Sequence, residues 1–212
     1  MAVRCDNPQP AVVVIDDDQD VREALSGLLQ TVGLRAELFG SVQEFLSRPR
    51  ATRPACLVLD VRLPGRSGLD FYDDLVKAKA NMPVVFISGH ADVTMSVRAM
   101  KAGAAEFLTK PFRHQDLLEA IQLAIERDLV SRGEKNMVAA VQAKFDTLTQ
   151  REREVMKLVV AGRLNKQVAA AMGISTATVK LHRGSVMRKM KSKSLAELVR
   201  AAEMLERTRL RA

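Results

Sequence analysis

An α/β fold with a doubly wound, five-stranded parallel sheet, followed by a small all-α domain, is predicted from three features of the sequence. In the first 130 residues, short apolar runs rich in β-branched residues alternate five times with segments of helical period, which is typical of parallel sheets covered on both faces. Beyond residue 146 only the helical period remains. The charge also changes, because residues 1–130 carry 15 Lys and Arg against 18 Asp and Glu, whereas residues 131–212 carry 18 against 7.

The elements of the first part follow one another in strict alternation. The predicted strands are the apolar runs at 11–15, 35–39, 57–59, 84–87 and 106–108. The predicted helices occupy 21–32, 41–46, 68–79, 92–101 and 115–126, and several of them begin after a Ser or Asp that can cap the first turn. This order gives a parallel sheet with helices as the crossover connections.

The second part is predicted to contain four helices joined by tight turns. They occupy 151–160, 166–171, 176–190 and 195–205, and Gly162 and Gly173 end the first two. The stretch before them is polar and prone to form helix, so we expect it to continue the fifth helix as a semi-rigid spacer. The predicted organisation is an α/β domain at 10–128, a helical linker at 129–145 and a helical domain at 146–207.

Composition favours a globular protein of the cytosol. The chain is 47% apolar and 27% charged, and it has no uninterrupted apolar stretch of the roughly 18–20 residues that cross a membrane. Residues 1–10 lack the apolar core of a signal peptide. Cys56 lies in an apolar run and is expected to be buried, and neither Cys56 nor Cys5 is expected to form a disulfide or bind a metal. We therefore expect a cytoplasmic protein with no membrane partner.

Polar residues follow the predicted strands, at the sheet edge where open parallel sheets bind their ligands. Asp16 and Asp17 follow the first strand, Asp60 the third, Ser88 the fourth and Lys110 the fifth. Three neighbouring carboxylates repel one another unless a hard cation such as Mg²⁺ neutralises them, and Mg²⁺ is typically held by one or two carboxylates together with waters and a phosphate. The sequence therefore predicts a site for a metal and a phosphoryl group.

Four motifs occur in this part in a characteristic order. They are VVIDDD at 13–18, LDVRLPG at 59–65 with Gly68 after it, FISGH at 86–90 and FLTKPF at 107–112. Their order and spacing resemble those of receiver domains from two-component response regulators, which have a flavodoxin-like fold. The resemblance implies that Asp60 accepts a phosphoryl group from a sensor histidine kinase. It also implies that Asp16, Asp17, Asp60 and the backbone carbonyl of Arg62 hold Mg²⁺.

The same resemblance implies further roles. Lys110 pairs with the phosphate, and the Lys110–Pro111 peptide is cis. Ser88 turns toward the phosphoryl oxygen while Phe107 changes rotamer; threonine is commoner at the position of Ser88, so this residue departs from the pattern only in size. We expect His90 to be a surface residue of the switch loop, because the phosphorylated histidine belongs to the separate kinase. The chemistry is consistent, since a carboxylate is a competent phosphoryl nucleophile and cations neutralise the developing charge.

One predicted helix of the second part is basic and contains no acid. Its cationic residues, within the helix or just after it, are Lys180, Arg183, Arg188, Lys189, Lys191 and Lys193, together with His182. A short helix, a turn at 172–175 and then this helix is the order of a helix-turn-helix, whose second helix enters the major groove of double-stranded DNA. We expect Thr178, Val179, Lys180 and Arg183 to divide between reading bases and holding phosphates. Val179 and Lys180 are expected at the base edges, and His182, Arg183 and Lys189 at the phosphates.

Further residues strengthen this interpretation. The runs LTQREREV at 148–155, NK at 165–166, GIS at 173–175, TVK at 178–180 and HR at 182–183, with Gly162 and Ala169, resemble the LuxR-type DNA-binding domain. Together with the receiver-like part, the architecture is similar to the NarL/FixJ class, and its long helical linker to the FixJ-type members. Gly184 departs from helix propensity at a cost of about 0.5–1 kcal/mol relative to Ala, and would permit close approach of another backbone.

Four alternatives compete with the interpretation as a phosphorylation-controlled transcription factor that dimerises and binds two half-sites. The acids could merely cap helices or face solvent, as we expect for Asp18 and Asp20, and the basic helix could be a solvated surface. A dehalogenase-like enzyme would need a second acid two residues after Asp60, where the chain has Arg62. A constitutive DNA-binding protein with a vestigial receiver disagrees with the complete acidic set. We therefore expect no enzyme, apart from a receiver that catalyses its own phosphoryl transfer and dephosphorylation.

Overall fold

The computed structural model describes residues 10–47, 55–80, 82–89 and 92–211. The chain forms two compact units, residues 1–132 and residues 133–212, and each has its own core. Among the predictions, those for Cys5 and His90 concern residues outside the described ranges. Cys56 is fully buried as predicted, and this burial raises the pKa of its thiol.

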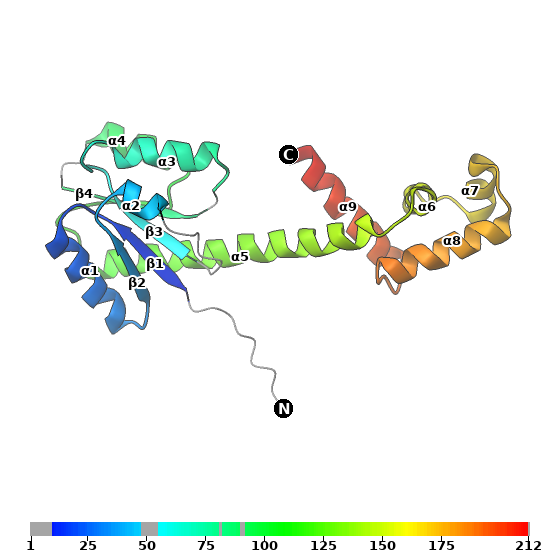
Figure 1. The fold of residues 1–212 in the computed structure, drawn as a ribbon, viewed down its shortest axis with the longest axis horizontal. Helices are drawn as coiled ribbons and strands as arrows, with labels where there is room; N and C mark the ends of the chain where they lie inside the picture. The colour runs from blue at the N-terminus through cyan, green and yellow to red at the C-terminus, as the bar shows by residue number, and fades with distance from the viewer. Residues whose placement is uncertain (1–9, 48–54, 81, 90–91, 212) are drawn as a thin grey trace, which may run out of the picture. The chain divides into compact units, whose positions relative to one another are not determined.

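The first unit contains a five-stranded parallel sheet (Figure 1). Its strands are β1 (Ala11–Ile15), β2 (Arg35–Phe39), β3 (Ala55–Asp60), β4 (Val84–Ser88) and β5 (Glu106–Thr109). They lie in the order β2-β1-β3-β4-β5, and every neighbouring pair is parallel. This arrangement confirms the predicted doubly wound sheet. Because the order reverses between β1 and β3, the carboxyl ends of these two strands flank the crevice in which such folds bind ligands.

Helices cover both faces of the sheet. They are α1 (Gln19–Thr31), α2 (Val42–Leu46), α3 (Gly68–Lys77), α4 (Val93–Lys101) and α5 (His114–Asp146). The helices α1 and α5 lie on one face, and α2, α3 and α4 on the other (Figure 1). The first four of these helices begin after a residue whose side chain accepts a hydrogen bond from the first turn: Asp18, Ser41, Ser67 and Asp92. These caps explain why the sequence located the helix starts closely.

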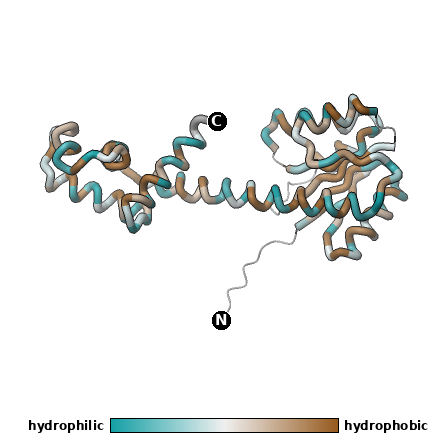
Figure 2. Tube along the Cα trace, turned by 180° about the vertical axis from the view of Figure 1, so that it is seen from behind, coloured by the Kyte–Doolittle hydropathy of each residue, from teal (hydrophilic) through white to brown (hydrophobic). Residues whose placement is uncertain are grey.

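Side chains of the strands alternate between two apolar cores. Val12 and Val14 of β1 pack in the core beneath α1 and α5, whereas Val13 and Ile15 pack in the core beneath α2, α3 and α4. Since both faces are covered, the central strands are apolar at nearly every position and appear brown in Figure 2. The polar residues of these strands, such as Asp60, are therefore confined to strand ends.

The second unit is helical. It contains the end of α5, then α6 (Gln150–Val160), α7 (Asn165–Met172), α8 (Thr176–Lys189) and α9 (Leu195–Arg211). The helix α5 includes the predicted linker residues 129–145. Gly173 adopts the left-handed conformation, with φ of 67°, in the turn between α7 and α8. Within the described part of the chain, no helix combines the length and the apolarity that a membrane crossing requires.

Candidate functional site

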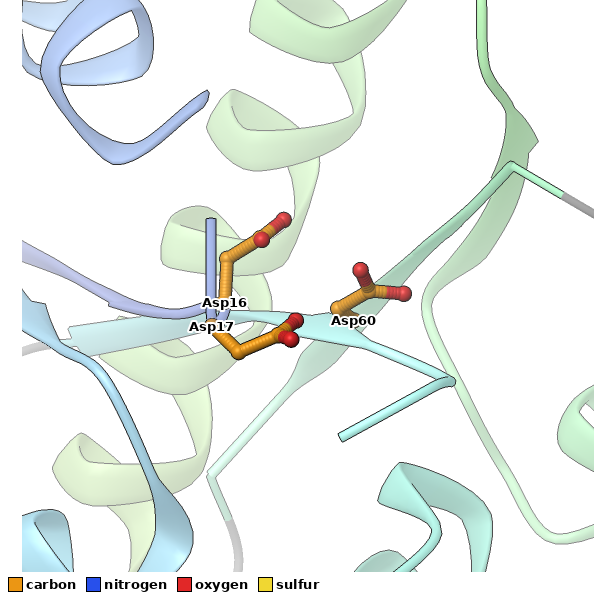
Figure 3. A group of neighbouring side chains, drawn as sticks. All are labelled: Asp16, Asp17 and Asp60. Atoms are coloured by element: carbon orange, nitrogen blue, oxygen red, sulfur yellow. The ribbon is translucent and has the colours of Figure 1, made fainter. Parts of the chain in front are cut away.

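Three carboxylates meet at the carboxyl end of the sheet (Figure 3). Asp16 and Asp17 follow β1 directly, and Asp60 is the last residue of β3, which pairs with β1. Each contributes one oxygen to a group whose members all lie within 4.8 Å of one another. Asp16 is fully buried and Asp60 is 7% exposed, whereas Asp17 is open to solvent. The structure thus brings together the three acids that the sequence singled out.

The ammonium of Lys110 lies between two of these acids. Its Nζ is 2.7 Å from Oδ2 of Asp16 and 3.1 Å from Oδ2 of Asp60. The remaining oxygens accept backbone hydrogen bonds, because the N–H of Asp18 donates to Oδ1 of Asp16 at 2.9 Å and the N–H of Arg62 to Oδ1 of Asp60 at 3.1 Å. Both buried carboxylates are therefore oriented by one cation and one backbone donor, which is the pairing that buried charges require.

Burial and charge act in opposite directions on the ionisation of these groups. Burial raises the pKa of the Asp16 carboxyl, although the hydrogen bond from Lys110 and the Asp18 N–H lower it in part. Burial alone would lower the pKa of Lys110, but its hydrogen bonds to Asp16 and Asp60 and their charges outweigh burial and raise it. Lys110 is therefore a permanent cation near neutral pH and supplies a fixed positive charge beside Asp60.

Gly68 allows the backbone to pack closely behind the site. A Cβ atom at this position would lie 2.2 Å from the carbonyl oxygen of Asp60, a distance that no side chain can tolerate. The N–H of Gly68 also donates to the carbonyl of Val61 at 2.9 Å. The loop after β3 is thereby held against the start of α3, which explains in physical terms why glycine follows the LDVRLPG motif at this spacing.

The predicted switch residues occupy the neighbouring strands. Ser88 is the last residue of β4 and is fully buried, and Phe107 of β5 is partly buried with its ring centroid 6.1 Å from that of Phe86. The Lys110–Pro111 peptide is cis, as predicted. Ser88 and Thr109 are paired in the β4–β5 ladder, so Ser88 and Lys110 approach the same edge of the sheet as the acids.

The donor set is chemically suited to Mg²⁺. Magnesium prefers oxygen ligands, and carboxylates from β1 and β3 supply them within a few ångströms of a solvent-exposed acid, Asp17. The Lys110 ammonium contacts two of the three carboxylates, those of Asp16 and Asp60, and its one positive charge does not balance all three, so the group retains negative charge that a divalent cation would neutralise. In the described ranges, Asp16, Asp17 and Asp60 are the acids whose oxygens lie close enough together to bind one metal ion.

The predicted DNA-contacting residues of α8, in the second unit, differ in their exposure to solvent. Lys180 is exposed, and Thr178, His182 and Arg183 are partly exposed. Val179 is fully buried and packs in the core of the unit, so the prediction that it lies at base edges is wrong. Residues 179, 186 and 190 form the buried stripe of α8 at helical spacing, and Val179 belongs to that stripe.

Lys189 is also engaged inside the unit. Its Nζ donates to Oε2 of Glu152 at 2.6 Å and to the carbonyl of Thr147 at 3.2 Å. Glu152 is buried at the start of α6, where it completes a capping box with Thr149. The prediction that Lys189 contacts a DNA phosphate is therefore not supported, because its ammonium joins α8 to α6.

Leu181 is a further exposed residue of α8 that the charge pattern of the sequence did not single out. Leu181 is 74% exposed, although its size and apolarity favour burial. It lies two residues after the buried Val179 and so on the other side of the helix, next to Lys180. Its apolar side chain gave no sign in the sequence that it lies on the surface. Arg183 donates from Nη1 to Oδ1 of Asn165 at 3.0 Å, which joins α8 to the start of α7.

Both parts of the chain match known protein families. Residues 12–122 match the response regulator receiver domain, and residues 146–202 match bacterial regulatory proteins of the luxR family. Nodulation protein W of Bradyrhizobium diazoefficiens is 49% identical over 194 residues, which are 92% of this chain and 86% of that protein.

Further similarity extends over both units. The transcriptional regulatory protein FixJ of Rhizobium meliloti is 40% identical over 191 residues, covering 90% of this chain and 94% of that protein. A solved structure of the response regulator StyR is similar with a TM-score of 0.85 at 42% identity, and covers 92% of this chain and 98% of that one. Each of these similarities covers at least 90% of this chain and so extends over both its α/β part and its helical part.

Proposed function

Because the chain belongs to the family of two-component transcriptional response regulators that join a receiver domain to a LuxR-type DNA-binding domain, we propose that its switch is the phosphorylation of Asp60. The observation that carries this assignment is the geometry of Asp60. Asp60 is 7% exposed, and its carboxylate accepts hydrogen bonds from Lys110 and the Arg62 N–H and lies beside Asp16 and Asp17.

Phosphoryl transfer requires a nucleophile and compensation of negative charge. One oxygen of Asp60 attacks the phosphorus of the donor, a phosphohistidine of a sensor kinase, forming an acyl phosphate as the bond to the donor breaks. Asp16, Asp17, Asp60 and the backbone carbonyl of Arg62 would hold Mg²⁺, which supplies charge neutralisation at the phosphoryl oxygens. The Lys110 ammonium then leaves the Asp60 oxygen and pairs with the phosphoryl group bound to Asp60. The receiver thus catalyses its own phosphorylation and, with water as the acceptor, its dephosphorylation.

The switch residues respond to the new phosphate. Ser88 is at the end of the strand beside β3 and donates its hydroxyl to a phosphoryl oxygen. Phe107, which is only partly buried, then moves into the space that the Ser88 side chain leaves, beside Phe86. The movements of the Ser88 hydroxyl and the Phe107 ring thereby couple the added charge at Asp60 to the shape of the surface formed by α4 and β5.

A homodimer formed on phosphorylation is the third part of the proposal. Val93, Val97 and Met100 of α4 are 79%, 43% and 45% exposed, and their spacing places them along one side of the helix. An exposed apolar row of this kind is typical of an interaction surface. Dimerisation would bring two DNA-binding units to two half-sites of an operator.

The DNA contacts are assigned to exposed and partly exposed residues of α8. We place Lys180, Leu181 and Thr178 at the base edges, where the Leu181 side chain suits a thymine methyl group, and His182 and Arg183 at phosphates. In this proposal residues 10–128 are the receiver, 129–145 the linker and 146–207 the DNA-binding domain. The protein works in the cytoplasm, since that is where a bacterial regulator meets its DNA.

Incubation with acetyl phosphate and Mg²⁺ tests the proposal at its first step. Mass spectrometry should show an acid-stable, base-labile adduct of one phosphoryl group in the wild-type protein and none in Asp60→Asn. Asp20→Asn is the matched control, because Asp20 is an exposed acid near the site that is not among the three gathered carboxylates. An adduct of equal yield in Asp60→Asn would remove Asp60 from the nucleophile position.

A further inference from the structure

A buried carboxylate lies in the first unit away from the acidic site. Asp128 of α5 is 2% exposed, although it carries a charge that burial makes costly. Its Oδ2 accepts a hydrogen bond from the N–H of Ala55 at 3.0 Å and another from Nε of Arg132 at 2.5 Å. The proposed phosphorylation chemistry does not use this group, so its burial calls for a separate explanation.

The partner of Asp128 is the first residue of β3. The last residue of the same strand is Asp60, which Lys110 and the Arg62 N–H hold at the other end. Every residue of β3 is buried, and the strand pairs with β1 on one side and β4 on the other. One stiff strand therefore has the acidic site at its carboxyl end and α5 at its amino end.

The hydrogen bond from the Ala55 N–H to the Asp128 carboxylate, here called the Asp128 anchor, restricts the position of α5 along β3. If α5 shifted by one turn along β3, the Asp128 carboxylate and the Ala55 N–H would separate, and two buried polar groups would lose this partner. Arg132, on the next turn of α5, reinforces the same position of the carboxylate. The arrangement favours discrete positions of α5 over gradual sliding, as a switching element requires.

We propose that Asp128 is a positioning residue that fastens α5 to β3 and thereby passes the phosphorylation state of Asp60 to the linker. The helix α5 continues into the second unit, where Val141 and Phe145 pack against its core and Arg153 lies 5.0 Å above the Phe145 ring. A change at the Asp128 anchor would thus reach a helix that the DNA-binding unit also holds. This inference rests on the proposed role of Asp60.

Hydrogen exchange on the full chain tests the anchor. Beryllium fluoride with Mg²⁺ serves as the phosphoryl mimic, and exchange is measured in peptides covering residues 129–146 with and without it. The wild-type protein should change its exchange in these peptides. Asp128→Ala should lose that change, whereas Asp128→Asn should retain it, because an amide oxygen can still accept the Ala55 N–H. Asp128→Leu replaces the carboxylate by an apolar side chain and serves if the alanine variant does not fold.

Two controls separate the possible outcomes. Glu119→Ala removes an exposed carboxylate of α5 that is hydrogen-bonded to Gln115, and should respond like the wild type. The acetyl phosphate adduct is measured in every variant. If the wild type forms no adduct, the proposed function fails. If the adduct forms but residues 129–146 do not respond in the wild type, or respond equally in Asp128→Ala or Asp128→Leu, the inference is overturned. If the contact is only structural, its loss in Asp128→Ala would lower the melting temperature but leave the change in exchange of residues 129–146.

Discussion

At the scale of single residues, every buried charged side chain in the described part of the chain has a compensating partner. Asp16 and Asp60 share Lys110, and Glu152 accepts from Lys189 and from the N–H of Thr149. The two groups of charges differ in their balance of acids and bases. The first retains excess negative charge beside exposed Asp17, which suits a cation, whereas the second pairs one acid with one base and stabilises the fold.

The Glu152–Lys189 pair predicts how stability depends on pH. The hydrogen bond from Lys189 lowers the pKa of Glu152 below its ordinary value of 4.5, with a smaller contribution from Thr149 and against the effect of burial. A carboxyl whose pKa is lower in the folded state stabilises that state above its unfolded pKa, and the stabilisation is lost as the pH falls through the folded pKa. We therefore expect the pair to contribute fully at pH 7, and its contribution to begin to decline at about pH 4.5 and to disappear as the pH falls through the lower pKa of the folded state.

Glu152→Gln is the corresponding variant. It should reduce the free energy of unfolding at pH 7 by about 1.5–3 kcal/mol, the range for a hydrogen bond to a charged group, and the difference from wild type should shrink in acid. Urea unfolding followed by circular dichroism at pH 7 and pH 4 measures this, with Glu154→Gln, which removes a more exposed ion pair with Arg151, as control. A difference that stays constant with pH would contradict the assignment.

The DNA-binding helix shows which residues sequence periodicity could not assign. Val179 and Leu181 are both apolar residues of one basic helix, so their chemistry alone does not tell which of them packs inside. The structure decides, because α6 and α7 cover the side of α8 that carries Val179, Val186 and Met190. Lys189 was assigned from its charge in the same way, and its buried partner Glu152 lies 37 positions away in the sequence. Such long-range pairing has no local signal.

Leu181→Ala tests the corrected DNA interface. Because the side chain is 74% exposed, the variant should change stability by less than about 0.5 kcal/mol. Affinity for an operator selected from a random pool should fall, while affinity for random DNA and its salt dependence stay the same, since an apolar contact carries no phosphate charge. Leu195→Ala at the start of α9 is the control. Equal loss on both kinds of DNA would mean that Leu181 does not contact bases.

At the scale of elements, local chemistry made most of the fold predictable. Strand positions followed from apolar runs, and helix starts from side-chain caps such as Asp18 and Ser175. The spacing of Asp16, Asp60 and Lys110 relative to strand ends also sufficed to gather the acidic site, because parallel strands end at one edge. The anchor between α5 and β3 was not predictable, since Asp128 and Ala55 are 73 positions apart and an Asp on a helix ordinarily faces solvent.

At the scale of the whole molecule, two units with opposite charge perform separate tasks. The acidic first unit gathers three carboxylates that fit a cation site, and the basic second unit matches the luxR family of bacterial regulatory proteins. Each unit has its own core, and in the proposed function phosphorylation acts on DNA binding through α5 and through dimerisation. A regulator of this kind needs a coupling free energy between its two sites, of about 1–3 kcal/mol in typical cases.

The most direct measurement of this coupling is the affinity of the full chain for its selected operator, by fluorescence anisotropy at fixed salt, with and without beryllium fluoride and Mg²⁺. The wild-type protein should bind roughly 5–150-fold more tightly with the mimic, the range that such a coupling free energy gives. Asp60→Asn should bind with the lower affinity in both conditions. Equal affinities of the wild-type protein in both conditions, while the acetyl phosphate adduct forms on Asp60, would contradict control of DNA binding by this site.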